Sequence, residues 1–162
     1  MNITIAAGET GTAVMRYDRD AQGNVDVTDI DRLPTGLDPA VEWLERAFPD
    51  FPRIGGAHVT IDGTGLGQAL WARLHVRVAD GWTLYDKRGR DRQELVDSLL
   101  VATSEARVHI SPSAHGEALR KALSSYHKVI GDDGIVGGEL VAALALAAIP
   151  PRKYRRPIFS SY

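Results

Sequence analysis

The amino-acid sequence predicts an α/β domain with a mixed sheet. Three strand-like runs rich in β-branched residues open the chain, at residues 3–6, 12–17 and 25–33, and turn residues separate them. Strand-like and helical segments alternate along the rest of the chain. Consecutive strands joined by short turns pair antiparallel, whereas strands that alternate with helices pair in parallel. We therefore expect an antiparallel meander followed by parallel strands, with helices covering the sheet.

The middle of the chain, residues 57–74, carries the first candidate functional residue. A β-branched run over residues 58–61 ends on Asp62, three glycines follow within five residues, and residues 68–74 have helical apolar spacing. This pattern indicates a strand, a tight turn and a helix, with Asp62 at the strand end where open α/β sheets bind ligands. A turn-capping role for Asp62 is the alternative. The glycines match neither G-x-G-x-x-G nor a Walker loop, so a nucleotide-binding loop is not indicated.

Helix signals and helix breakers divide the rest of the chain. We expect Asp38 to cap a helix that has Pro39 just inside it and that ends before Pro49. The last apolar segment is hydrophobic nearly all round, which predicts a helix packed on several sides. The other expected elements are a strand at 82–85, a basic loop at 86–92, a helix at 93–102, a strand at 107–110, a helix after the signal at 111–113, a glycine-rich link at 131–138 and the apolar helix at 139–149.

Composition limits the class of protein. A chain of 162 residues suits one domain, which we place at residues 1–150, followed by a basic and aromatic tail at 151–162. The formal net charge of -2 excludes a strongly basic nucleic-acid binder as a whole-domain property. The absence of cysteine excludes a disulfide framework and a thiolate metal site. No run approaches ~18 apolar residues and no signal-peptide pattern is present, so we expect a cytoplasmic protein with no membrane partner.

Four segments, in order along the chain, carry a resemblance to a known family. They are T-A-V-M-R-Y, V-T-I-D-G-T-G-L-G-Q-A-L, D-R-Q-E-L-V-D-S-L-L and E-L-V-A-A-L-A-L-A. They are similar to the nuclease domain of the large terminase subunit of tailed phages and prophages, and the order of elements resembles the ribonuclease-H-like fold. The resemblance implies a DNA endonuclease related to genome packaging in a bacterial host cell. Its implied partners are DNA and phage packaging proteins.

The resemblance also implies Mg²⁺ or Mn²⁺ held by acids on the first strand, the central strand and the last helix. These cations prefer oxygen ligands, and carboxylates on neighbouring strands, ~4.8 Å apart, can share one cation. Asp62 matches the central acid, and Glu139 is the one acid where the family has His-Asp-Asp, because the triplet here reads G-G-E. Ala6 stands where the first-strand acid is expected. The candidates to replace that ligand are Glu9, Asp132 and Asp133. The last two also fit a glycine-flanked turn.

Two groups of basic residues are candidates for contacts with DNA phosphates. The predicted loop contains Lys87, Arg88, Arg90 and Arg92, and the tail contains Arg152, Lys153, Arg155 and Arg156. The tail cations flank an aromatic residue, Tyr154, a pattern that suits a nucleic-acid backbone with an unstacked base, or an acidic protein. Large apolar residues at its end favour docking or self-association through the tail. Solvated charges and a loose terminus are the alternatives.

The sequence leaves two functions open. The first is a metal-dependent DNA endonuclease in which Asp62 and Glu139 are catalytic metal ligands. The second is a catalytically degenerate domain that acts as a DNA- or protein-binding or assembly module, because Ala6 and Gly138 replace charge at two positions of the family pattern. Glu139 at a helix start is also stabilised by the helix dipole, by ~0.3–1 kcal/mol, without any metal.

Overall fold

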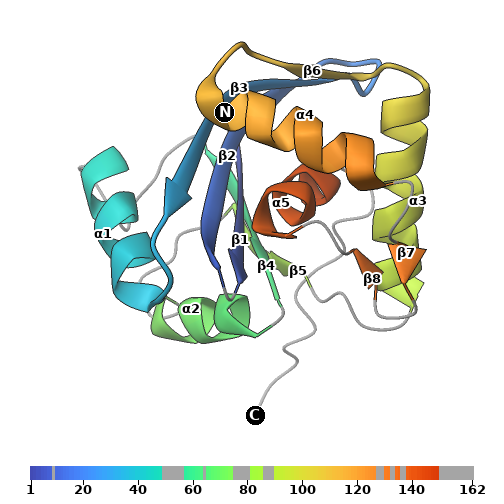
Figure 1. Cartoon of the computed structure of the whole chain (residues 1–162). Coiled ribbons are helices and arrows are strands. Elements are labelled where there is room, and N and C mark those ends of the chain that lie inside the picture. The colour runs from blue at the N-terminus through green and yellow to red at the C-terminus, as the bar shows by residue number, and fades with distance from the viewer. Residues whose placement is uncertain are drawn as a thin grey trace.

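The fold is built on one six-stranded mixed sheet. A computed structural model describes residues 1–8, 10–48, 57–63, 65–74, 81–85, 90–126, 130–131, 134–135 and 138–149. The strand order is β5-β4-β1-β2-β3-β6 (Figure 1). The strands are β1 (Asn2–Gly8), β2 (Gly11–Arg19), β3 (Val25–Leu33), β4 (His58–Asp62), β5 (Trp82–Tyr85) and β6 (Val108–Ile110). Strands β1 to β3 form the expected antiparallel meander, and β4, β5 and β6 each pair in parallel with a neighbour.

This arrangement confirms the predicted ribonuclease-H-like mixed sheet. Strand β1 has an antiparallel neighbour, β2, on one side and a parallel neighbour, β4, on the other. The parallel pair needs a crossover, and α1 lies in the connection that returns the chain from β3 to β4. As a result, β1 and β4 end at the same edge of the sheet, and that edge carries the strand-end acid.

Five helices cover the two faces of the sheet. They are α1 (Leu37–Ala47), α2 (Leu66–Leu74), α3 (Arg90–Ser104), α4 (Ala114–Tyr126) and α5 (Gly138–Ala148). One core cluster joins α1 and α2 to one face, and a second cluster joins α3, α4 and α5 to the other (Figure 1). Alternating side chains of β1 divide between the clusters, since Ile3 and Ile5 belong to the first and Ala6 to the second.

Helix α5 lies directly on the sheet and under two other helices. All its residues from 140 to 147 are buried, and it contacts β1, β2, α3 and α4. The Thr4 hydroxyl donates a hydrogen bond to the Ala143 carbonyl at 2.9 Å, which ties β1 to the middle of the helix. A helix that is apolar all round has no face for water, so it takes this central position. The expectation of packing on several sides is confirmed.

Three local predictions need correction. Helix α1 begins at Leu37 after Gly36 and has no side-chain cap, so Asp38 is not the N-cap; it pairs instead with Arg73 of α2 at 2.5 Å. Residues 90–92 belong to α3 rather than to a basic loop. The glycine-rich link contains a small hairpin, β7 (Ile130–Gly131) and β8 (Gly134–Ile135).

Within the part of the chain that the structure describes, none of the helices has the length and hydropathy needed to span a bilayer.

Candidate functional site

Asp62 is the last residue of β4 and is almost fully buried. Its residue exposure is 3%, and its backbone partner across the parallel ladder is Tyr85 of β5. The chain turns sharply after it, because Gly67 in the first turn of α2 packs against the Asp62 carbonyl, where any Cβ would overlap the oxygen. The last glycine of the motif is therefore a steric requirement of the strand-to-helix turn. The predicted position of Asp62 at the carboxyl end of a strand is confirmed.

Ala6 lies beside Asp62 on the neighbouring strand. The parallel register pairs Ile5 with Ile61, so the next residues along each strand, Ala6 and Asp62, stand side by side. Paired residues of parallel strands point to the same face. For Ala6 that is the face covered by α5, where it is 1% exposed. A methyl group thus occupies the place where the resemblance implies a second carboxylate.

Glu139 lies in the first turn of α5, above the end of β1. The helix runs antiparallel to β1, because Thr4 contacts Ala143 whereas Gly8 lies under Glu139. A Cβ on Gly8 would overlap the Glu139 carboxylate. The turn that follows β1 also holds this carboxylate, because the Thr10 backbone N–H donates to Oε1 at 3.2 Å and the Thr10 hydroxyl contacts Oε1 and Oε2, each at 2.9 Å.

The fold therefore brings Asp62 and Glu139 to the same edge of the sheet. Gly8 lies two residues beyond Ala6, which corresponds to ~7 Å along the strand, and neighbouring strands are ~4.8 Å apart. The Cα atoms of Asp62 and Gly8 are thus roughly 8 Å apart. One carboxylate comes from the sheet and the other from the start of the helix that covers it.

The carboxylate oxygens of Asp62 and Glu139 are the type of ligand that a hard divalent cation prefers. Their number is smaller than the three acids that the resemblance implies. Mg²⁺ is commonly bound by one or two protein carboxylates together with substrate phosphates and water. Among the described residues, however, no group of three His, Cys, Asp or Glu side chains is placed to hold a metal ion. Glu139 also has part of its lone-pair capacity occupied by Thr10. Asp62 and Glu139 are therefore two of the three acids that the resemblance implies.

The remaining predicted site residues do not enter this geometry. Glu9, Asp132, Asp133, Lys87, Arg88, Arg152, Lys153, Arg155 and Arg156 lie outside the described residues. Arg90 and Arg92 are in the first turn of α3, and their side chains are likewise outside the description. Thr10 is the residue that the sequence did not reveal. No pattern in the turn A-G-E-T-G marks it as the partner of a side chain 129 positions away.

The hydrogen bonds between Thr10 and Glu139 give a first testable prediction. In a double-mutant cycle of Thr10→Val and Glu139→Gln, we expect a coupling free energy of about 1 kcal/mol, since both changes weaken the same hydrogen bonds. Chemical denaturation of the four proteins measures it. The matched control pairs Thr10→Val with Glu117→Gln, an acid in the first turn of α4. That pair should be additive, and equal coupling in both cycles would contradict the contact.

The chain matches no protein-family model, and no curated protein matches it in sequence.

Proposed function

We propose that this chain is a terminase-nuclease-like protein of a phage or prophage, a DNA endonuclease that depends on Mg²⁺ or Mn²⁺ and is related to genome packaging. The observation that carries the proposal is the placement of Asp62 and Glu139 at the same edge of the sheet. One is a buried acid at the end of the strand parallel to β1, and the other is an acid in the first turn of the helix above β1. The strand order around β1 and the resemblance of the four sequence segments support the same assignment.

The residues of this edge have distinct roles in the proposal. A divalent cation, when bound, polarises the phosphodiester and lowers the pKa of an attacking water. In this proposal, Asp62 and Glu139 coordinate the cation, and Glu9, Asp132 or Asp133 supplies the third carboxylate. Burial of Asp62 strengthens its attraction for a cation, because water screens a buried charge less. The basic residues of segment 87–92 and of the tail hold the DNA phosphates.

Asp62→Asn tests the proposal directly. We expect wild-type protein to nick supercoiled plasmid in Mn²⁺, and we expect Asp62→Asn to reduce the rate at least about a hundredfold, because a carboxylate ligand contributes several kcal/mol through the metal. The matched control is Asp26→Asn, which removes an exposed acid from β3. It should cut at the wild-type rate. Equal rates for wild type and Asp62→Asn over a range of Mn²⁺ concentrations would refute the endonuclease.

A second candidate function is favoured by two specific observations. Ala6 places a methyl group beside Asp62, and the Thr10 hydroxyl occupies both carboxylate oxygens of Glu139 with hydrogen bonds. Both suit a catalytically degenerate ribonuclease-H-like domain that binds DNA or a packaging protein and cuts neither. In that case the protein should shift labelled duplex DNA, or associate with itself, equally well in EDTA and in Mn²⁺.

A further inference from the structure

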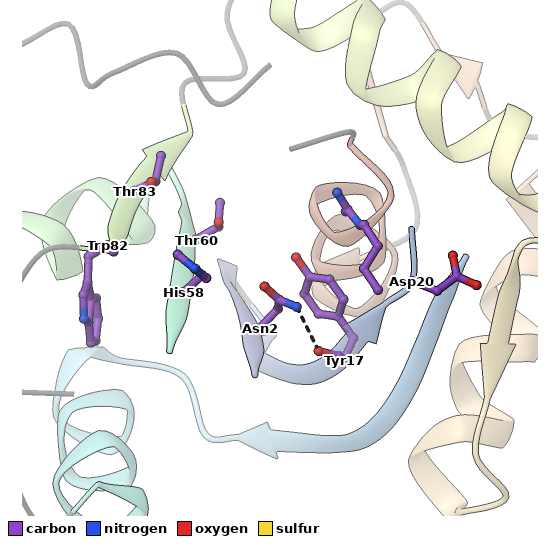
Figure 2. A pocket seen from close by; sticks show the side chains of 9 residues that line it. Asn2, Tyr17, Asp20, His58, Thr60, Trp82 and Thr83 are labelled. Atoms are coloured by element: carbon purple, nitrogen blue, oxygen red, sulfur yellow. Dashed lines mark hydrogen bonds between the residues drawn. The ribbon is translucent and has the colours of Figure 1, made fainter. Parts of the chain in front are cut away.

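A second concave site lies at the opposite end of the sheet from Asp62. It has a volume of about 480 Å³ and is lined by residues at the start of β1, β4 and β5 and at the end of β2. Figure 2 shows Asn2, His58, Thr60 and Thr83 on adjacent strands, with Tyr17 beside Asn2 and Asp20 at the far end. Asp62 is the last residue of β4 whereas His58 is the first, so the two sites are separated by the length of that strand.

The pocket exists because the sheet presents polar side chains where its covering helix ends. Thr60 pairs with Thr4 on one side and with Thr83 on the other, so three hydroxyls form a row across β1, β4 and β5. Asn2 pairs with His58 and with Tyr17 in the next row. These rows share the face that α5 covers. The Thr4 hydroxyl donates its hydrogen bond to the Ala143 carbonyl of α5. The other polar side chains of these rows extend past Thr4 towards the start of the strands.

Several donors in the pocket have no hydrogen-bond partner among the residues that the structure describes. Among the described residues, no hydrogen bond engages the hydroxyls of Thr60 or Thr83, or the ring of His58. Thr60 is 6% exposed as a residue and lines this space. A hydroxyl that no protein group engages can form a hydrogen bond with water or with a ligand. The pocket therefore presents donors for a ligand.

Two charged side chains line the described part of the pocket. The Arg19 guanidinium has N–H donors left over, whereas the Asp20 carboxylate already accepts hydrogen bonds from its own turn. The Arg19 guanidinium lies 5.7 Å from the centre of the Tyr17 ring and donates to the Ala147 carbonyl, which leaves other N–H donors of its five. The Asp20 carboxylate accepts hydrogen bonds from Gln22 and from the backbone and side chain of Asn24. The Asn24 hydrogen bonds hold the pKa of Asp20 below its ordinary value, so it stays ionised within its own turn.

We propose that this pocket binds a 5′-mononucleotide. Hydroxyl, imidazole and guanidinium donors are groups that hold phosphate oxygens, and Thr60, Thr83, His58 and Arg19 all line this space. Tyr17 lines the space between these donors and Asp20, and the Asp20 carboxylate, which accepts three hydrogen bonds of about four that it can accept, has capacity left for a base N–H. A volume of about 480 Å³ is within the range of small-molecule sites. The inference does not depend on the endonuclease, because it uses none of the residues of that edge.

Titration of the isotope-labelled protein followed by NMR tests the site. We expect saturable shifts of the amides of Asn2, His58, Thr60 and Thr83 with at least one of the four 5′-ribomononucleotides at millimolar concentration or below. Inorganic phosphate should cause smaller shifts at the same amides, and the corresponding nucleoside should bind at least about tenfold more weakly, since it lacks the charged acceptor. No saturable shift with any of the four nucleotides, or equal affinity for nucleoside and nucleotide, would overturn the proposal.

Two near-isosteric variants locate the ligand. Thr60→Val and Thr83→Val each remove one hydroxyl, and each should weaken nucleotide binding about tenfold, because a hydrogen bond to a charged group is worth about that factor. The matched control is Thr28→Val in β3, which lies outside the pocket and should bind as the wild type does. Thermal melting of each variant verifies folding. Unchanged affinity in both pocket variants would place the ligand elsewhere and overturn the assignment.

Discussion

Ala6→Asp is expected to make the folding stability of this protein depend on a divalent metal ion. The new carboxylate would stand beside Asp62, at a position that is 1% exposed. Without a cation, an uncompensated buried charge next to a like charge costs about 3–5 kcal/mol. Mn²⁺ at 100 times its dissociation constant would return ~2.7 kcal/mol of this loss. The measurement is chemical denaturation of wild type and variant in EDTA and in Mn²⁺, accompanied by the plasmid-nicking assay.

A matched substitution separates metal binding from a general effect of buried charge. Ala40→Asp introduces the same side chain at a position that is 2% exposed, but in α1 on the opposite face of the sheet. It should destabilise the fold similarly and gain nothing from Mn²⁺. Equal recovery in both variants, or none in either, would show that the edge near Asp62 does not gather metal ligands. Recovery and nicking in Ala6→Asp alone would identify Ala6 as the residue that separates the degenerate domain from the endonuclease.

Leu144→Ala is expected to lower the free energy of unfolding by about 2–5 kcal/mol. Leu144 is fully buried in the middle of α5, the helix that the sheet, α3 and α4 all contact. Removing its side chain leaves a cavity with rigid walls on several sides, so the structure has little room to collapse around it. A loss of this size is a large part of the ~5–15 kcal/mol that holds a typical domain together. Urea denaturation at constant m-value measures the loss.

The control for this prediction is a truncation of similar kind on the surface. Val101 in α3 is 48% exposed, so Val101→Ala should change the free energy of unfolding by less than about 0.5 kcal/mol. If Leu144→Ala cost no more than Val101→Ala, α5 would not be the inner helix of the fold. The comparison matters for function as well, because α5 also positions Glu139 over the end of β1.

Local patterns determined much of this protein. The β-branched runs specify the meander. The predicted helix-start signal before α4 is confirmed, since Ser113 Oγ accepts a hydrogen bond from the Gly116 N–H at 2.9 Å. The run that ends on Asp62 specifies a strand end, and the following glycines specify the turn. These features depend on residues close together in the chain. For the same reason, the absence of an acid at position 6 was visible from the sequence alone.

Only the tertiary structure decided which distant residues those features contact. Thr10 and Glu139 are 129 positions apart, and their contact follows from the antiparallel placement of α5 on β1. Asp38 likewise has a distant partner, because it pairs with Arg73 in α2 and does not cap its own helix. The row of Thr4, Thr60 and Thr83 comes from strand registers that no single segment encodes. Side-chain neighbours across a sheet are set by the packing of the whole chain, and a one-residue change of register would turn every one of them to the other face.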